Sequence, residues 1–190
     1  AALAQPFAVG ALLREQVETD LDALLARVAL DPHDSGLYGA GLILTKAALF
    51  LPQFVGIVAF PRLARARAER ARRLAVLAVA VVGACATAGT AALSGLALVL
   101  VGGDQYAEVQ PLLWLFALEG SLLAIVQLLV FDALARRSHG IVSLLWAASA
   151  VAAAVILLAP LHVGGVVTTM VATSAVVAAT AWALSTRAGD

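Results

Sequence analysis

The sequence predicts an all-α membrane protein, a bundle of about six transmembrane helices, and three observations support this fold class. Hydrophobic residues make up 63% of the 190 residues, with a mean hydropathy of +1.00, whereas soluble domains are roughly 45–50% apolar. Apolar runs of about 20 residues, enough for a helix to cross a bilayer core about 30 Å thick, recur along the chain. None of these runs shows the alternating polarity of a membrane β-strand. Finally, the arginines between the apolar runs fall only in alternate connections.

The six predicted spans form a single lobe over residues 1–190, because no hydrophilic linker is long enough to separate two domains. We expect the chain to be a fragment of a longer protein, since it opens at Ala1 without Met and without the basic start of a signal peptide. The spans are predicted, in order, at residues 5–30, 37–60, 74–101, 109–131, 141–161 and 165–184.

The distribution of arginine predicts the orientation of every span. The connections DPHDSG, GGDQYAE and APLHVGG contain no arginine, whereas the other connections and the end of the last span contain Arg62, Arg65, Arg67, Arg70, Arg72, Arg73, Arg136, Arg137 and Arg187. Short loops keep Lys and Arg on the cytoplasmic side during membrane insertion. We therefore expect both termini to be cytoplasmic and the protein to lie in the cytoplasmic (plasma) membrane of a bacterium.

The first predicted span differs from the rest because it is charged, with Arg14, Glu15, Glu18, Asp20, Asp22 and Arg27 in an otherwise apolar stretch. A charge at the centre of a lone helix costs roughly 2.5–3.5 kcal/mol on insertion scales, so this helix must face protein, water or an opposite charge. An amphipathic helix on the membrane surface is the alternative. The charges point to several sides of a helix, which favours a span that lines a cavity.

Three ionisable residues are predicted at a common depth in the membrane. Asp22 and Lys46 lie at nearly equal distances from the hairpin centre at His33, which places Lys46 about 15 Å below the outer interface. Glu119 comes eleven residues after Glu108 and reaches a similar level. Such groups usually face a bundle interior or an aqueous cavity. The alternative is a static ion pair of Lys46 with Asp22 or Glu18 that only locks two helices together.

Proline and the missing motifs complete the prediction from the residues alone. Pro52 interrupts the second span and is the candidate hinge, because an interior proline removes one backbone hydrogen bond. His33, His139 and His162 fall in three different connections, which argues against a shared metal or catalytic centre. No nucleophile with a base at helical spacing and no phosphate-binding glycine loop occurs. We expect no enzyme activity, no catalytic residue, no metal, no cofactor and no nucleic-acid partner.

Two stretches resemble a known family. The first reads SGLYGAGLILTKAALFLPQFVGIVAFPRLAR and follows DLDALLARVAL. The second reads GGDQYAEVQPLLWLFAL. The chain resembles the C-terminal half of bacterial polysaccharide biosynthesis proteins, the lipid-linked oligosaccharide flippases of the multidrug, oligosaccharidyl-lipid and polysaccharide exporter superfamily. The positions that match the family pattern are Asp22, Arg27, Gly36, Tyr38, Phe60, Pro61 and Arg62.

The resemblance implies one six-helix lobe of a two-lobed flippase, with an N-terminal lobe missing from this chain. It further implies alternating access around a central cationic cavity that takes the headgroup of an undecaprenyl-linked oligosaccharide, within membrane lipids and alongside polysaccharide-assembly proteins. An anionic headgroup would seek Lys46 or Arg14, while Asp22, Glu18 or Glu119 would couple a proton or cation.

Two alternatives remain open. The same superfamily includes exporters of cationic drugs and of the peptidoglycan lipid precursor, and the mixture of acidic and basic candidates does not separate these substrates. The second alternative is a nontransporting membrane scaffold that recruits glycosyltransferases through its arginine-rich loop.

Overall fold

The computed structural model describes residues 23–63, 68–135, 140–159 and 161–187, and almost all of these are helical, with no strand among them. A helical segment over residues 23–29 comes first. The elements that follow are α2 (Pro32–Leu63), α3 (Ala68–Ala92), α4 (Ser94–Val101), the 3₁₀ helix η1 (Asp104–Leu112), α5 (Leu113–Ala135), α6 (Gly140–Leu158) and α7 (Val163–Arg187). The predicted all-α class is confirmed.

Three stretches within the described residues are long and apolar enough to cross a membrane. They cover Arg73–Ala92, Asp104–Val130 and Val163–Leu184, and a shorter apolar helix covers Leu144–Leu158. This agrees with a membrane protein. The bundle of six spans and its similarity to one lobe of a flippase stay predictions.

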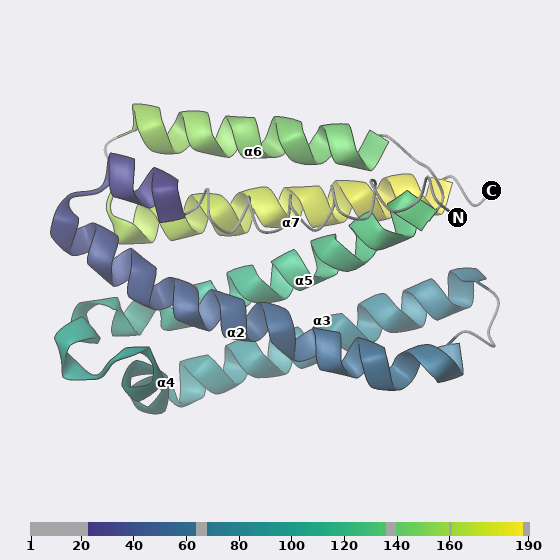
Figure 1. Ribbon diagram of the computed structural model, residues 1–190, viewed down its shortest axis with the longest axis horizontal. Helices are drawn as coiled ribbons and strands as arrows, with labels where there is room; N and C mark the ends of the chain where they lie inside the picture. The colour runs from purple at the N-terminus through teal and green to yellow at the C-terminus, as the bar shows by residue number, and fades with distance from the viewer. Residues whose placement is uncertain (1–22, 64–67, 136–139, 160, 188–190) are drawn as a thin grey trace, which may run out of the picture.

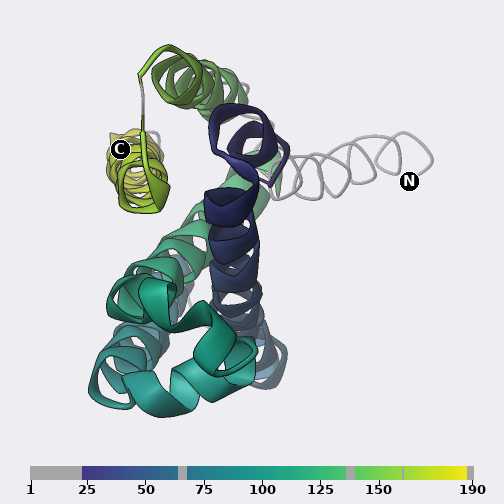
Figure 2. The ribbon, with the colours of Figure 1, turned by 90° about the vertical axis from the view of Figure 1, so that its left-hand side faces the viewer.

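The helix α5 lies at the centre of the arrangement. Figure 1 shows it between α7 on one side and the pair α2 and α3 on the other, and it contacts all three. The helix α6 packs mainly along α7 and lies at the edge of the molecule in both Figure 1 and Figure 2. The core therefore follows α5, with α6 as its most peripheral member.

Three consecutive residues in the middle of α5 face its three neighbours, since successive side chains on a helix point about 100° apart. Glu119 accepts a hydrogen bond from Ser174 of α7, with an oxygen–oxygen distance of 2.7 Å. Gly120 lies against the backbone of α2 at Thr45. The Ser121 hydroxyl donates to the Ala117 carbonyl of its own helix at 2.7 Å and lies 3.2 Å from the Gly83 carbonyl of α3. This short segment fixes the level at which α5 meets each partner.

The contact between α2 and α5 depends on small residues and one aromatic pair. A Cβ atom added at Gly41 would overlap the ring of Phe116, which itself meets Tyr38 edge to face with ring centres 5.4 Å apart. Thr45 donates its hydroxyl to the Phe116 carbonyl at 3.0 Å. Both aromatic rings are nearly inaccessible to solvent, so this crossing is a closely packed part of the core.

The third predicted span is wrong as a single helix, because the stretch 74–101 is divided between α3 and α4. The break is at Leu93, whose φ of −113° and ψ of 40° lie outside the helical region. The helix α4 then ends at Gly102 and Gly103, which take φ values of 139° and 83° and donate their N–H groups to the Leu98 carbonyl. Glycine adopts these angles without steric cost.

Other span boundaries also differ from the prediction. The second span starts at Pro32 because Asp31 caps the helix: its Oδ1 accepts the N–H groups of His33 and Asp34 at 2.9 Å. Proline suits the first helical position, where its missing N–H is not needed. The same helix reaches Leu63, three residues past the predicted end. The fourth span opens as the 3₁₀ helix η1 around Pro111, while α6 and α7 match the fifth and sixth spans within three residues.

Candidate functional site

Lys46 lies near the middle of α2 with an exposed side chain. It follows Thr45, whose carbonyl group touches Gly120 of α5, so Lys46 stands at the level of the α2–α5 crossing but turns away from it. No acidic side chain among the described residues forms an ion pair with it.

The exposed side of α2 around Lys46 is a continuous face. Gly36, Gly39, Ile43, Lys46 and Phe50 are exposed and recur every three or four residues, which is the spacing of one helical face. A Cβ atom added at Gly36 or Gly39 would find no other atom within 4 Å. The face is therefore open on the side that leads from the lysine to the start of α2.

Glu119 is buried, with 4% of its surface exposed. It borders a cavity of about 120 Å³ between α5, α6 and α7, to which Leu25 of the first helical segment also contributes. The other polar side chains that line this cavity are Ser149, Thr173 and Ser174. A carboxylate inside a membrane-spanning helix is costly unless it is paired or takes up a proton or cation, and the serine hydroxyl supplies one partner.

The structure places Lys46 and Glu119 at one level but does not bring them together. Their helices touch at Gly120, one residue after Glu119, so the predicted common depth of these two residues agrees with the contact. Lys46, however, points out of the molecule while Glu119 points to α7. Among the described residues, Lys46 therefore lies on an open face and Glu119 borders an enclosed cavity.

Three of the remaining candidates from the sequence are not placed. Arg14, Glu18 and Asp22 lie outside the described residues, so the charged first span and its pairing with Lys46 stay predictions. Pro52 lies within α2, and the helix continues through it to Leu63. The hinge at Pro52 stays a prediction as well.

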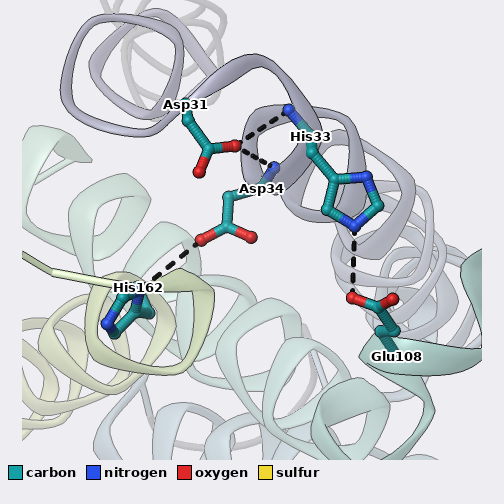
Figure 3. A network of polar contacts seen from close by, with 5 residues as sticks. All are labelled: Asp31, His33, Asp34, Glu108 and His162. Carbon is teal, nitrogen blue, oxygen red and sulfur yellow. Dashed lines mark hydrogen bonds and ion pairs between the residues drawn. The ribbon is translucent and has the colours of Figure 1, made fainter.

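A polar network joins three connections at one end of the helices, the left end in Figure 1. Figure 3 shows its members, Asp31, His33, Asp34, Glu108 and His162. The Nε2 atom of His33 lies 3.1 Å from Glu108 Oε2, and the Nδ1 atom of His162 lies 3.8 Å from Asp34 Oδ2. The network therefore ties the start of α2 to η1 and to the start of α7.

Glu108 raises the pKa of His33, through its hydrogen bond first and through its negative charge second. Asp31 and Asp34 add smaller effects in the same direction. Since His33 and Glu108 are both well exposed, this pair is a surface contact that responds to pH.

Sequence reasoning missed this network, although one signal was present. The string Asp-Pro-His-Asp has an N-cap residue followed by proline, the usual start of a helix, so it places His33 on a helix rather than in a loop. The three connections are the ones without arginine, and the structure joins them at one end. No group of metal-binding side chains occurs among the described residues.

Comparison of the chain with models of known protein families, with curated protein sequences and with solved structures gives no match.

Proposed function

We propose that this protein is a membrane transporter that moves a lipid-linked oligosaccharide across the bacterial cytoplasmic membrane by alternating access, as a step of polysaccharide biosynthesis. The proposal joins the sequence resemblance around Gly36–Arg62 to one structural observation, which is the exposed lysine in the middle of α2.

An exposed lysine at this height cannot face lipid tails at low cost. At about 15 Å from the predicted outer interface it would lie near the bilayer midplane, where a lysine costs roughly 2.5–3.5 kcal/mol on insertion scales. Intramembrane lysines instead face water-filled cavities or other protein segments. We therefore assign the Lys46 face of α2 to an aqueous chamber between this lobe and a second helical lobe.

The chemistry of that face suits an anionic headgroup. Lys46 supplies a positive charge that no described carboxylate neutralises, and a pyrophosphate would pair with it. The open surface at Gly36 and Gly39 leaves room beside this charge for the first sugars. The membrane-embedded polyprenyl tail needs no pocket of its own, because it remains in lipid.

Glu119 is our candidate for coupling transport to an ion. Its buried carboxylate accepts a hydrogen bond from Ser174 across the α5–α7 contact, beside a cavity that reaches α6. Uptake of a proton or a cation by this carboxylate would change the contact between α5 and α7, while α5 also holds α2 through Gly120. The lobe would then have two conformations, and ion binding to this carboxylate would shift the equilibrium between them.

Replacement of Lys46 by Met in the host's chromosomal gene tests the proposal. We expect polysaccharide export to stop and lipid-linked oligosaccharide to accumulate inside the cell, because the headgroup loses its cationic partner. Lys46→Arg should keep export, and Val81→Ala, at an exposed position of α3, serves as the matched control. Normal export by Lys46→Met, at wild-type membrane abundance, would remove the lysine from the mechanism and the proposal with it.

A further inference from the structure

A second pocket lies where α3 gives way to α4, opposite the start of α5. It has a volume of about 360 Å³ and is lined by Thr90, Ala91, Ser94, Gln110, Pro111 and Trp114. Trp114 precedes Glu119 by five residues, so along α5 it lies about 7.5 Å closer than Glu119 to the end that carries the polar network. It is separate from both the Lys46 face and the cavity at Glu119.

A single residue, Leu93, interrupts the helical backbone at this pocket, and its N–H and carbonyl groups still bond to Gly89 and Ala97. Leu93 leaves the helical region between Thr90 and Ser94, and no side chain caps α4 there. Irregular backbone within an apolar stretch is tolerated where it lines a cavity, and discontinuous helices commonly form substrate sites in transporters. The break therefore singles out this pocket among the surfaces of α3.

The lining of the pocket is polar and uncharged. Gln110 Nε2 donates to the Ser94 hydroxyl oxygen over a long distance of 3.3 Å. A glutamine amide has a second N–H and a carbonyl oxygen, and a serine hydroxyl has its own hydrogen, so both side chains retain capacity for a ligand. No charged side chain lines the described pocket, which disfavours a phosphate or a cationic drug there.

Trp114 adds an aromatic surface to these polar groups, and 41% of its surface is exposed. The flat C–H face of a pyranose ring packs against an indole ring, while its hydroxyl groups need amide and hydroxyl partners at the edge. The indole also carries an N–H donor. The pocket thus offers a neutral sugar an exposed tryptophan, the Gln110 amide and the Ser94 hydroxyl. The Thr90 hydroxyl donates its hydrogen to the Ala86 carbonyl at 2.9 Å and can only accept a hydrogen bond from a sugar.

We propose that this pocket, formed by Thr90, Ser94, Gln110 and Trp114, is a binding site for a neutral sugar unit of the transported oligosaccharide. The assignment rests on the proposed function. It adds a second contact to that function, one that recognises sugar separately from the pyrophosphate contact at Lys46.

Single-tryptophan variants of the natural full-length protein test this site. The variant Trp146→Phe with Trp182→Phe keeps Trp114, and the control Trp114→Phe with Trp182→Phe keeps the exposed Trp146; any further tryptophan of the natural chain is replaced by Phe in both. Purified proteins in lipid nanodiscs are titrated with maltotetraose, chitotetraose and mannotetraose, and separately reconstituted with brominated phospholipid. We expect at least one sugar to change the emission of Trp114 saturably without changing that of Trp146. Brominated lipid should quench Trp146 more strongly than Trp114.

The substitution Gln110→Ala in the Trp114 variant gives the second measurement. It should weaken the sugar response by about tenfold, the usual effect of losing one well-placed hydrogen-bonding side chain. A missing response to all three sugars, or one unaffected by Gln110→Ala, overturns the proposal. Trp114 quenching by brominated lipid without a sugar response would identify an interfacial aromatic residue instead.

The sugar titration and the export assay fail independently of each other. Loss of export by Lys46→Met without sugar binding at Trp114 would refute only the sugar site. Sugar binding at Trp114 with normal export by Lys46→Met would refute the proposed function but not the binding of sugar in this pocket.

Discussion

Replacement of Gly120 by Ala tests whether α2 and α5 cross as closely as the structure shows. The added methyl group would overlap the Thr45 carbonyl oxygen and lie 2.9 Å from the Cβ atom of Ala48, whereas carbon atoms in contact are about 3.5–4.0 Å apart. The obstacle is backbone, so no side-chain rotation relieves it and the two helices must separate.

The expected magnitude follows from two opposing effects. Overpacking of this kind costs about 1–3 kcal/mol, and alanine in place of glycine returns about 0.5–1 kcal/mol of helix stability. We therefore expect Gly120→Ala to lose about 1–2 kcal/mol of unfolding free energy. The matched control is Gly39→Ala on α2, where no atom lies within 4 Å of the added Cβ and only the gain of about 0.5–1 kcal/mol applies.

The assay is unfolding of the purified protein in mild detergent by increasing SDS, followed by circular dichroism, with thermal midpoints as a second measure. Gly120→Ala should unfold earlier than wild type and Gly39→Ala at the same point or later. Equal stability of the two variants would refute the close crossing, and with it the argument that Lys46 and Glu119 share one level.

Two further predictions concern polar contacts. Because Glu108 raises the pKa of His33, the pair's contribution to stability is fully present below the ordinary histidine pKa and is lost as pH rises through the raised value. NMR titration of Glu108→Gln should move the His33 pKa back toward its ordinary value, and an unchanged titration would contradict the assignment. Ser174→Ala removes the hydroxyl that donates a hydrogen bond to Glu119 and should cost about 1–3 kcal/mol of stability. Ser149→Ala, in the same cavity, should cost about 0.5 kcal/mol or less. Equal losses of stability from both variants would contradict a stabilising hydrogen bond between Ser174 and Glu119.

Sequence alone determined the class of the fold and the approximate positions of its helices. Runs of apolar residues long enough to cross a bilayer leave the backbone no alternative to helix, because every N–H and carbonyl group must find a partner within the chain. The three arginine-free connections lie together at one end, where the network through His33, Glu108 and Asp34 joins them, while their side of the membrane stays a prediction.

Sequence could predict the level of Glu119 and Lys46 but not their direction. The rise of a helix is constant at 1.5 Å per residue, so depth follows from counting along the chain. The side of the helix that each residue faces depends on which neighbour packs there. Gly120 meets α2, which leaves Glu119 to α7 and turns Lys46 outward.

Only the tertiary structure decided where apolar helix gives way to irregular backbone. The stretch 74–101 carries no charged residue and is mostly apolar, so its composition favours one helix. The break at Leu93 accompanies a pocket whose lining comes from Gln110 and Trp114, which are distant in the sequence. A local pattern records which conformations a segment tolerates, whereas packing with the rest of the chain selects among them.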